Sequence, residues 1–184
     1  VEREIYKEVK KEFINQGCYF VNEEEKLKME KIIDTPYGSL NAKIVGKTAS
    51  QLADMAKIEV PEDTKIIIAE ETGVGKGYPF SREKLSPILA FYVEDDWKKG
   101  CDKCIELLDY GGMGHTLGIH SNDKDIIMEF ALRKPASRII VNSPTTHGAI
   151  GATTNLAPAL TLGCGAVGGS ATSDNVSSMN LINI

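Results

Sequence analysis

The sequence is poor in metal-binding residues, and this shortage excludes several kinds of protein. Among 184 residues there are three histidines and four cysteines, of which only Cys101 and Cys104 form a C-x-x-C pair. A structural zinc site needs a second pair of cysteines or histidines, so a buried helix face is the favoured interpretation of these two residues. We expect no metal site, free thiols and a cytoplasmic location, because scattered cysteines in an acidic chain are typical of a reducing compartment.

Long apolar runs and an excess of positive charge are also missing. The longest apolar runs, such as residues 66–69, are far shorter than the roughly 20 residues that cross a bilayer. The formal net charge is −5 without a basic stripe, which argues against a nucleic-acid partner. Residues 1–13 lack the apolar centre of a signal peptide, and the chain begins with valine inside a predicted helix. We therefore expect no membrane partner, and a chain that is part of a longer protein.

The apolar periodicity predicts an α/β fold. Helices are expected where apolar residues recur at helical spacing, and strands where short runs are apolar throughout. From residue 95 onward helices and strands alternate, which is typical of a parallel sheet with crossover helices. The predicted helices are residues 2–16, 22–33, 48–58, 95–111 and 123–134, and the predicted strands are residues 64–71, 88–94, 115–121 and 137–144.

Two glycine-rich segments resemble nucleotide-binding motifs, and both fail. Gly163, Gly165 and Gly168 spell G-x-G-x-x-G, yet neither a periodic helix nor the required acidic residue follows them. Residues 70–77 resemble a phosphate-binding loop, but Glu70 replaces its first glycine and Gly77 its final serine or threonine. A nucleotide-binding module built on these segments is disfavoured, and the glycines must serve another purpose.

Four segments carry a resemblance to a known family. They are "SREKLSPILAFY", "GGMGHTLGIHSND", "SRIIVNSPTTHGAIG" and "LAPALTLGCGAVGGSATSDNV". In this order and spacing they resemble the aldehyde dehydrogenase superfamily, and within it the coenzyme A-acylating branch found in bifunctional aldehyde–alcohol dehydrogenases. The resemblance implies a three-layer αβα catalytic domain with a mostly parallel sheet. We expect residues 1–170 to form part of that domain, and residues 171–184 to form a C-terminal return or oligomerisation segment.

The same resemblance implies an activity and its partners. Members of this branch oxidise a short-chain aldehyde with NAD and pass the acyl group to coenzyme A, reversibly, through a cysteine thioester. A small aldehyde, coenzyme A and NAD are therefore the expected ligands of the intact protein, and a homo-oligomer its expected state. The expected location is the cytoplasm, with a bacterial microcompartment left open.

Site residues follow from the matched motifs. Glu83 matches the family glutamate that holds the nicotinamide ribose, and Leu85 stands where hydrolytic relatives usually carry phenylalanine. His115 matches the histidine of the "GHT" motif, near the thioester, where it is expected to transfer a proton. The residues expected to line the substrate pocket are Asn142, Pro144, Thr145, Gly163, Cys164 and Gly165.

The family nucleophile has no counterpart in this chain. In the family that cysteine lies just upstream of the helix that opens the present sequence, and none of the four cysteines here has that context. The resemblance therefore implies a catalytic-domain portion without its nucleophile and without the NAD domain. The alternative is a non-catalytic fragment or scaffold that keeps the fold and the oligomer contacts.

Overall fold

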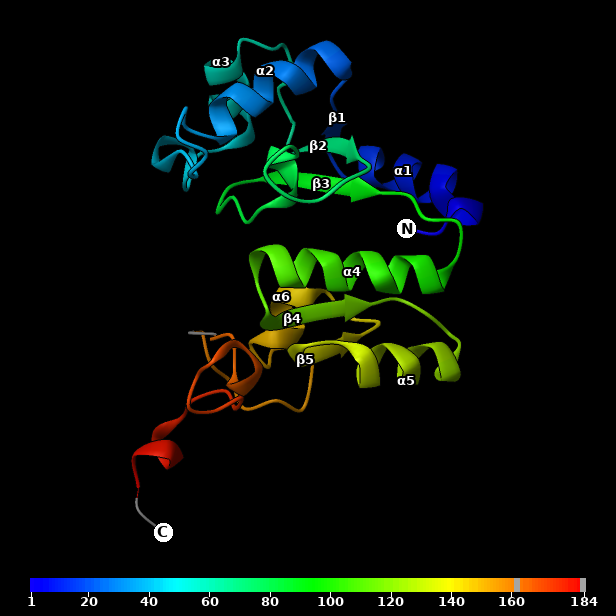
Figure 1. Cartoon of the computed structure of the whole chain (residues 1–184), viewed down its shortest axis with the longest axis vertical. Coiled ribbons are helices and arrows are strands. Elements are labelled where there is room, and N and C mark those ends of the chain that lie inside the picture. Colours follow the sequence, from blue (N-terminus) through cyan, green and yellow to red (C-terminus); the bar gives the residue numbers. More distant parts are fainter. Residues whose placement is uncertain (161–162, 183–184) are drawn as a thin grey trace. The chain divides into compact units, whose positions relative to one another are not determined.

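The chain forms two compact units, Val1–Asp102 and Lys103–Ile184. The computed structural model describes residues 1–160 and 163–182. Each unit contains its own parallel β-sheet with helices connected to it, and Figure 1 labels the elements of both. Each unit is described by itself.

Unit 1 is built on a three-stranded sheet in the order β1-β2-β3, with both pairs parallel. Strand β2 is central because its isoleucine-rich run can be buried on both faces; Ile67 pairs with Ile88 of β3. The strands are β1 (Cys18–Phe20), β2 (Ile66–Glu71) and β3 (Ile88–Tyr92), and the helices are α1 (Tyr6–Asn15), α2 (Glu23–Ile33) and α3 (Ala49–Ala56).

The helix ends of unit 1 follow from local side chains. Asn22 and Glu25 form a capping box at the start of α2, and Thr48 and Gln51 form one at the start of α3. Gly17 follows α1 with φ of 92°, a left-handed conformation that favours glycine. From the sequence we expect the first helix to stop at Gly17 and the third to be capped by Thr48 or Ser50; the structure confirms Gly17 and shows Thr48 as the cap.

The core of unit 1 joins α2, α3 and β2 and also contains Phe80, from the loop before β3. Met29 of α2, Leu52 of α3 and Ile67 of β2 are fully buried in a single apolar cluster. Phe80 belongs to the same cluster with 0% exposure. Burial of an aromatic side chain stabilises by roughly 1.5–3 kcal/mol, so the turn that carries Phe80 is held against the core.

Unit 2 contains a two-stranded parallel sheet of β4 and β5, in which Thr116 pairs with Arg138. Helix α5 connects the strands, and the Asp123 carboxylate caps it by accepting from the backbone N–H of Asp125 and Ile126. The bounds are α4 (Trp97–Gly111, which begins within Unit 1), β4 (Gly114–Ile119), α5 (Lys124–Arg133), β5 (Ala136–Val141) and α6 (Thr145–Ala149). Two 3₁₀ turns follow, η4 (Ala166–Gly168) and η5 (Ser178–Leu181).

The predicted parallel α/β fold is confirmed, with three local differences. The strands belong to two sheets. Strand β1 and helix α6 were not predicted because they span three and five residues, too few for a period to show. From the sequence we expect Asp95 to cap the helix that begins there, which is wrong: the Asp96 carboxylate accepts from the backbone N–H of Lys99, and the Asp95 carboxylate is engaged by the Arg3 guanidinium and the Lys99 ammonium.

Two expectations concern the longer protein or the membrane. The separate role of residues 171–184 stays a prediction, and residues 183–184 lie outside the described part of the chain. Among the described residues, no helix is long and apolar enough to cross a membrane.

Candidate functional site

The first part of the candidate site is the segment of residues 79–85 in Unit 1, here named the Glu83 loop. It begins with the 3₁₀ turn η3 (Pro79–Ser81) and leads into β3. The buried Ser81 hydroxyl accepts from the backbone N–H of Gly75 at 3.0 Å and donates to the carbonyl oxygen of Tyr78 at 2.7 Å. Its first residues are therefore fixed by Phe80 in the core and by Ser81 in a local turn.

The middle of the Glu83 loop is tied to the segment that follows α2. The Arg82 guanidinium forms an ion pair with the Asp34 carboxylate and also donates to the carbonyl oxygen of Gly38 at 3.2 Å. Both partners of the ion pair are mostly buried, which makes such a pair more persistent than an exposed one. On the far side, the backbone N–H of Gly46 donates to the carbonyl oxygen of Leu85 at 3.0 Å.

Lys84 is buried within this loop. Its ammonium donates to the carbonyl oxygens of Phe80 at 2.5 Å and Arg82 at 2.7 Å. Burial lowers the pKa of Lys84 from 10.5 to about 8; the Glu71 carboxylate opposes this shift, and the Arg82 charge adds to it.

Glu83 and Leu85 are the exposed members of the loop. The Glu83 side chain faces solvent, and Leu85 is 57% exposed with φ of 50°. A left-handed leucine costs roughly 1–2 kcal/mol, and strain of this kind is concentrated at functional sites. The structure thus places the two predicted cofactor-binding residues two positions apart, outward from an anchored loop.

A separate candidate segment, in Unit 2, is residues 163–169, here named the glycine loop. Two neighbouring side chains of β5 hold it. The Ser137 hydroxyl donates to the carbonyl oxygen of Cys164 at 2.8 Å, and the Arg138 guanidinium donates to the carbonyl oxygen of Gly163 at 3.0 Å. The Cys164 thiol lies 3.2 Å from the carbonyl oxygen of Gly168 and 3.3 Å from the Ser170 hydroxyl.

The glycines of this loop answer a packing requirement. A Cβ at Gly165, which has φ of 65°, would lie 1.8 Å from the Ser137 hydroxyl, and one at Gly168 would lie 2.5 Å from the Cys164 thiol. A Cβ at Gly114 would lie 2.0 Å from the carbonyl oxygen of Cys164. The backbone at the start of β4 therefore packs directly on the glycine loop.

His115 is placed beside this contact. It follows Gly114 near the start of β4, and its side chain is exposed. His120, five residues further along and just after the end of β4, is also exposed. The residue before His115 thus contacts the glycine loop, although the two segments are distant in sequence.

The remaining predicted pocket residues lie after β5. The Asn142 amide donates to the carbonyl oxygen of Ser121 at 2.8 Å and accepts from its backbone N–H at 2.9 Å, so the side chain joins the ends of β4 and β5. Pro144 is the N-cap of α6, and Thr145 packs against β4, where a Cβ at Gly118 would lie 2.3 Å from the Thr145 hydroxyl.

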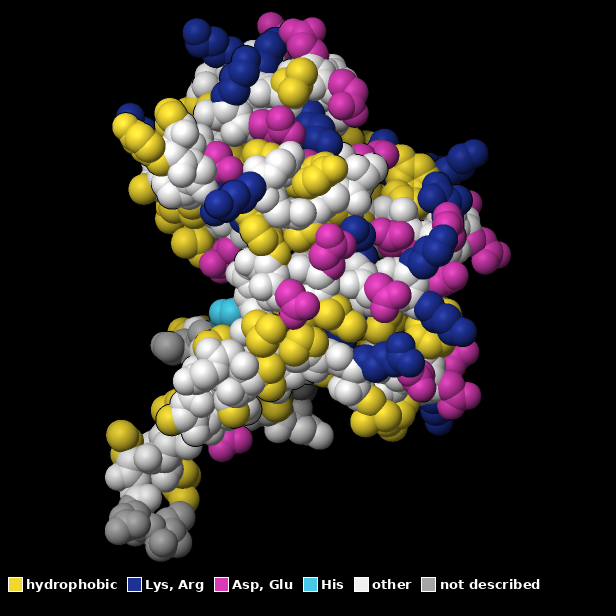
Figure 2. Space-filling model, in the orientation of Figure 1, with side chains coloured by type: hydrophobic (Ala, Val, Ile, Leu, Met, Phe, Trp, Pro, Cys, Tyr) yellow, Lys and Arg dark blue, Asp and Glu magenta, His cyan; other side chains and the backbone are white. Residues whose placement is uncertain are grey.

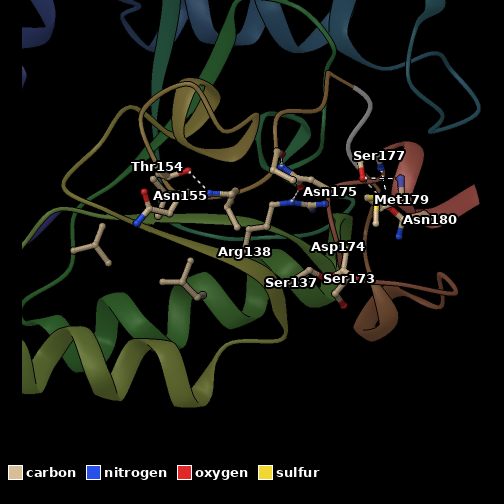
Figure 3. Close-up of a pocket in the computed structure, with 15 residues that line it drawn as sticks. Ser137, Arg138, Thr154, Asn155, Ser173, Asp174, Asn175, Ser177, Met179 and Asn180 are labelled. Atoms are coloured by element: carbon tan, nitrogen blue, oxygen red, sulfur yellow. Dashed lines mark hydrogen bonds between the residues drawn. The ribbon is translucent and has the colours of Figure 1, made fainter. Parts of the chain in front are cut away.

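A groove of about 840 Å³ is lined by β5. Figure 3 shows two of its residues, Arg138 and Asn175, that were not predicted from the sequence. Arg138 is 5% exposed, and its Nε donates to the Asn175 Oδ1 at 2.7 Å. The Asn175 amide donates to the carbonyl oxygens of Ala149 at 2.9 Å and Ala157 at 2.8 Å. The signal for Arg138 was a charge within an apolar strand; its partner lies 37 residues away.

Charge is distributed unevenly in the chain. Lysine, arginine and acidic side chains are interspersed on the face of Unit 1 that Figure 2 shows. Residues 163–182 contain one charged residue, Asp174, so the glycine loop and the segment after it are almost uncharged.

The comparisons with known proteins place this arrangement in a family. No family model matches the chain. Among curated proteins, the chain is 41% identical over its whole length to aldehyde-alcohol dehydrogenase 2 of Entamoeba histolytica, of which it covers 22%. Among solved structures, it matches an acetylating aldehyde dehydrogenase from Geobacillus thermoglucosidasius with 54% identity and a TM-score of 0.95, covering 100% of this chain and 40% of that one.

A second structure supports the same match. A probable aldehyde dehydrogenase from Listeria monocytogenes is 53% identical with a TM-score of 0.95, again over 100% of this chain and 40% of that one. The chain thus spans about a fifth of the curated aldehyde-alcohol dehydrogenases and two fifths of these two solved structures. The resemblance inferred from the sequence motifs is confirmed: this chain is homologous, over its whole length, to one portion of the acetylating aldehyde dehydrogenases and the aldehyde–alcohol dehydrogenases.

Proposed function

We propose that the chain is part of the catalytic domain of an NAD-dependent, coenzyme A-acylating aldehyde dehydrogenase. The reaction is RCHO + CoASH + NAD⁺ → RCO–SCoA + NADH + H⁺, reversible, with a short-chain aldehyde. The observation that carries the proposal is the 54% identity and TM-score of 0.95 over the whole chain to a protein described as an acetylating aldehyde dehydrogenase. A non-catalytic scaffold, the other hypothesis from the sequence, has no specific structural observation in its favour.

The Glu83 loop fits one end of NAD. An exposed carboxylate can accept hydrogen bonds from the two hydroxyls of a ribose, and the exposed Leu85 beside it offers an apolar contact to a flat ring. NAD, when bound, supplies the acceptor for the hydride that leaves the aldehyde carbon. In this proposal Glu83 and Leu85 bind and orient the nicotinamide riboside, and the anchors at Phe80 and Arg82 keep them in place.

His115 is proposed to act in acyl transfer. Coenzyme A must lose its thiol proton before it attacks the acyl-enzyme, and a neutral imidazole is a suitable base near pH 7. Its exposed side chain at the start of β4, directly after the glycine that packs on the glycine loop, supports this role. The glycine loop, with Gly163, Cys164 and Gly165, then forms one wall of the acyl pocket.

Asn142, Pro144 and Thr145 are proposed to complete the pocket as supporting residues. Both polar ends of the Asn142 amide are engaged by Ser121, so its contribution is to hold the ends of β4 and β5. Pro144 and Thr145 set the start of α6 beside them.

The nucleophile of the proposed reaction is a cysteine outside residues 1–184. A catalytic cysteine needs an accessible thiol with a lowered pKa. Cys101 is 1% exposed, and burial raises the pKa of the Cys18 thiol. The Cys164 thiol is engaged within the glycine loop by the carbonyl oxygen of Gly168 and the Ser170 hydroxyl, and we do not assign it as the nucleophile.

We also propose a cellular location and an oligomeric state for the intact protein. The four cysteines are free, which fits a reducing cytoplasm. One relative, 27% identical, is a propionaldehyde dehydrogenase from a bacterial microcompartment, so a microcompartment is an alternative location. A homo-oligomer is the proposed state of the intact protein.

The test is an assay of the full-length gene product. It is expected to produce NADH from acetaldehyde only when coenzyme A is present, with acyl-CoA formed in equal amount. Residues 1–184 alone are expected to produce none. A full-length product without coenzyme A-dependent NADH formation contradicts the proposal and favours the scaffold hypothesis.

A further inference from the structure

Lys84 lies in an unusual place for a lysine. It is 8% exposed, while its neighbours Glu83 and Leu85 both face solvent. A buried ammonium is costly unless hydrogen bonds compensate for the lost water, and here two carbonyl oxygens of the same turn, those of Phe80 and Arg82, accept from it. Lys84 is thus directed inward at the centre of the turn, while the residues on either side of it face outward.

We propose that Lys84 is a positioning residue for the cofactor: its ammonium closes the turn of residues 80–84 and so sets the direction of Glu83 and Leu85, and NAD affinity falls when the ammonium loses its proton. This rests on the proposed function, in which Glu83 and Leu85 hold the nicotinamide riboside.

The other anchors of the Glu83 loop lie on either side of Lys84. Phe80 is fixed in the core and Arg82 is fixed by Asp34, so both carbonyl acceptors sit on immobilised residues. The next anchor is the Leu85 carbonyl oxygen, which accepts from the backbone N–H of Gly46, and of the two residues between Arg82 and Leu85 it is Lys84 that is buried. Hydrogen bonds from a charged donor are roughly twice as strong as those from a neutral one, so a neutral amine holds the turn less tightly.

The proton on Lys84 is held loosely enough to be lost within the working range of an enzyme. Burial lowers the pKa of Lys84 to about 8, with Glu71 opposing the shift and Arg82 adding to it. Two charged groups act on Lys84, Glu71 on β2 and Arg82 in the loop. Glu71 pairs with Lys26 of α2 and interacts with Glu30 of the same helix, and Arg82 pairs with Asp34 after α2.

Substitution of Glu71 gives a second, independent way to change the pKa of Lys84. Its side chain is 1% exposed; Oε2 lies 3.0 Å from the Lys26 ammonium, and Oε1 is buried without a hydrogen-bond partner among the described residues. One oxygen of this buried carboxylate therefore has no donor in the described part of the chain, and the carboxylate raises the pKa of Lys84. Glu71→Gln keeps the size and an acceptor for Lys26 but removes that charge.

The experiment measures NAD affinity of the full-length gene product between pH 6.5 and 9.5. The dissociation constant of NAD is followed by calorimetry, and kcat and KM for NAD, aldehyde and coenzyme A are followed by NADH absorbance. For the wild type we expect affinity for NAD to fall about tenfold above pH 8, with kcat changing much less.

Three variants separate positioning from general structure. Lys84→Arg keeps its charge over this range and is expected to remove the pH dependence. Lys84→Met is expected to bind NAD about tenfold more weakly at pH 7, without the wild-type loss above pH 8. Glu71→Gln is expected to move the loss to lower pH. Lys43→Met, at an exposed lysine of Unit 1, is the matched control and is expected to behave as the wild type.

Each failure has a distinct meaning. A wild type that neither binds NAD nor forms NADH contradicts the proposed function and the inference with it. If the wild type is active and Glu83→Gln weakens NAD binding, but Lys84→Met binds NAD as the wild type does, the inference alone is wrong. An equal increase in KM for all three substrates in Lys84→Met also contradicts the inference. So does an unchanged pH midpoint of NAD affinity in Glu71→Gln.

Discussion

Replacing Asn175 with alanine removes the contact that ties three segments of Unit 2 together. The Asn175 side chain is 6% exposed within the residue set of Figure 3. It accepts from the Arg138 Nε on β5, and it donates to Ala149 at the end of α6 and to Ala157 further along the chain. Asn175→Ala therefore removes three buried hydrogen bonds, and the alanine side chain has no polar atom to replace any of them.

The size of the effect follows from the partners. The two bonds to carbonyl oxygens are neutral and contribute about 1 kcal/mol each. Loss of the acceptor for the Arg138 Nε costs more, about 1.5–3 kcal/mol, because a buried charged donor is left without its partner. We expect the free energy of unfolding to fall by about 3–5 kcal/mol, a large share of the roughly 5–15 kcal/mol that is typical of a domain.

Urea unfolding of the chain, followed by circular dichroism, measures this loss. The matched control is Asp174→Ala, because Asp174 is the exposed neighbour of Asn175, and its expected effect is within about 0.5 kcal/mol. A loss below about 1 kcal/mol for Asn175→Ala would refute the reasoning, since it would mean that Arg138 and the loop carbonyls find other partners at no cost.

Three further predictions concern single residues. Glu83→Gln in the full-length product is expected to lower kcat/KM for NAD by roughly ten- to a hundredfold, because a charge-assisted hydrogen bond is lost; an unchanged value returns Glu83 to the solvated surface. His115→Ala is expected to leave the burst of NADH intact and to slow acyl-CoA release by about 10²–10⁴-fold, while equal defects in both phases indicate a structural role. The folded pKa of Lys84 is lowered to about 8 from 10.5, so the unfolded chain binds more protons than the folded chain between these two pH values. The free energy of unfolding, relative to that of Lys84→Met, should therefore rise by up to about 3 kcal/mol from pH 8 to 10.5. Urea unfolding of both proteins at both pH values checks the sign.

The fold was predictable where the signal was local. The isoleucine run of β2 and the Thr48 cap of α3 follow from residues close to one another in sequence, and both were predicted. Strand β1 was missed because its three residues become a strand only by pairing with β2, which begins at Ile66. The division of the strands into two sheets also depends on long-range pairing, for which the order of elements gives no signal.

The candidate site divides in the same way. The motifs located Glu83, Leu85 and His115, because each lies in a short run that resembles the family. The residues that hold these segments were missed. Lys84 is hidden between two exposed residues, and Arg138 finds Asn175 37 residues away. Which polar side chain turns inward depends on the acceptors that the fold brings to it, and spacing does not encode this.

The most direct test of the central claim locates the acyl group. The full-length product is incubated with acetyl-CoA in the absence of NADH, so that a cysteine thiolate takes the acetyl group and releases coenzyme A thiol. Acid quenching, digestion and mass spectrometry then identify the modified residue. We predict one acetylated cysteine, outside residues 1–184, with Cys18, Cys101, Cys104 and Cys164 unmodified. Stoichiometric acetylation of Cys164, or no acetylated cysteine at all, would contradict the account.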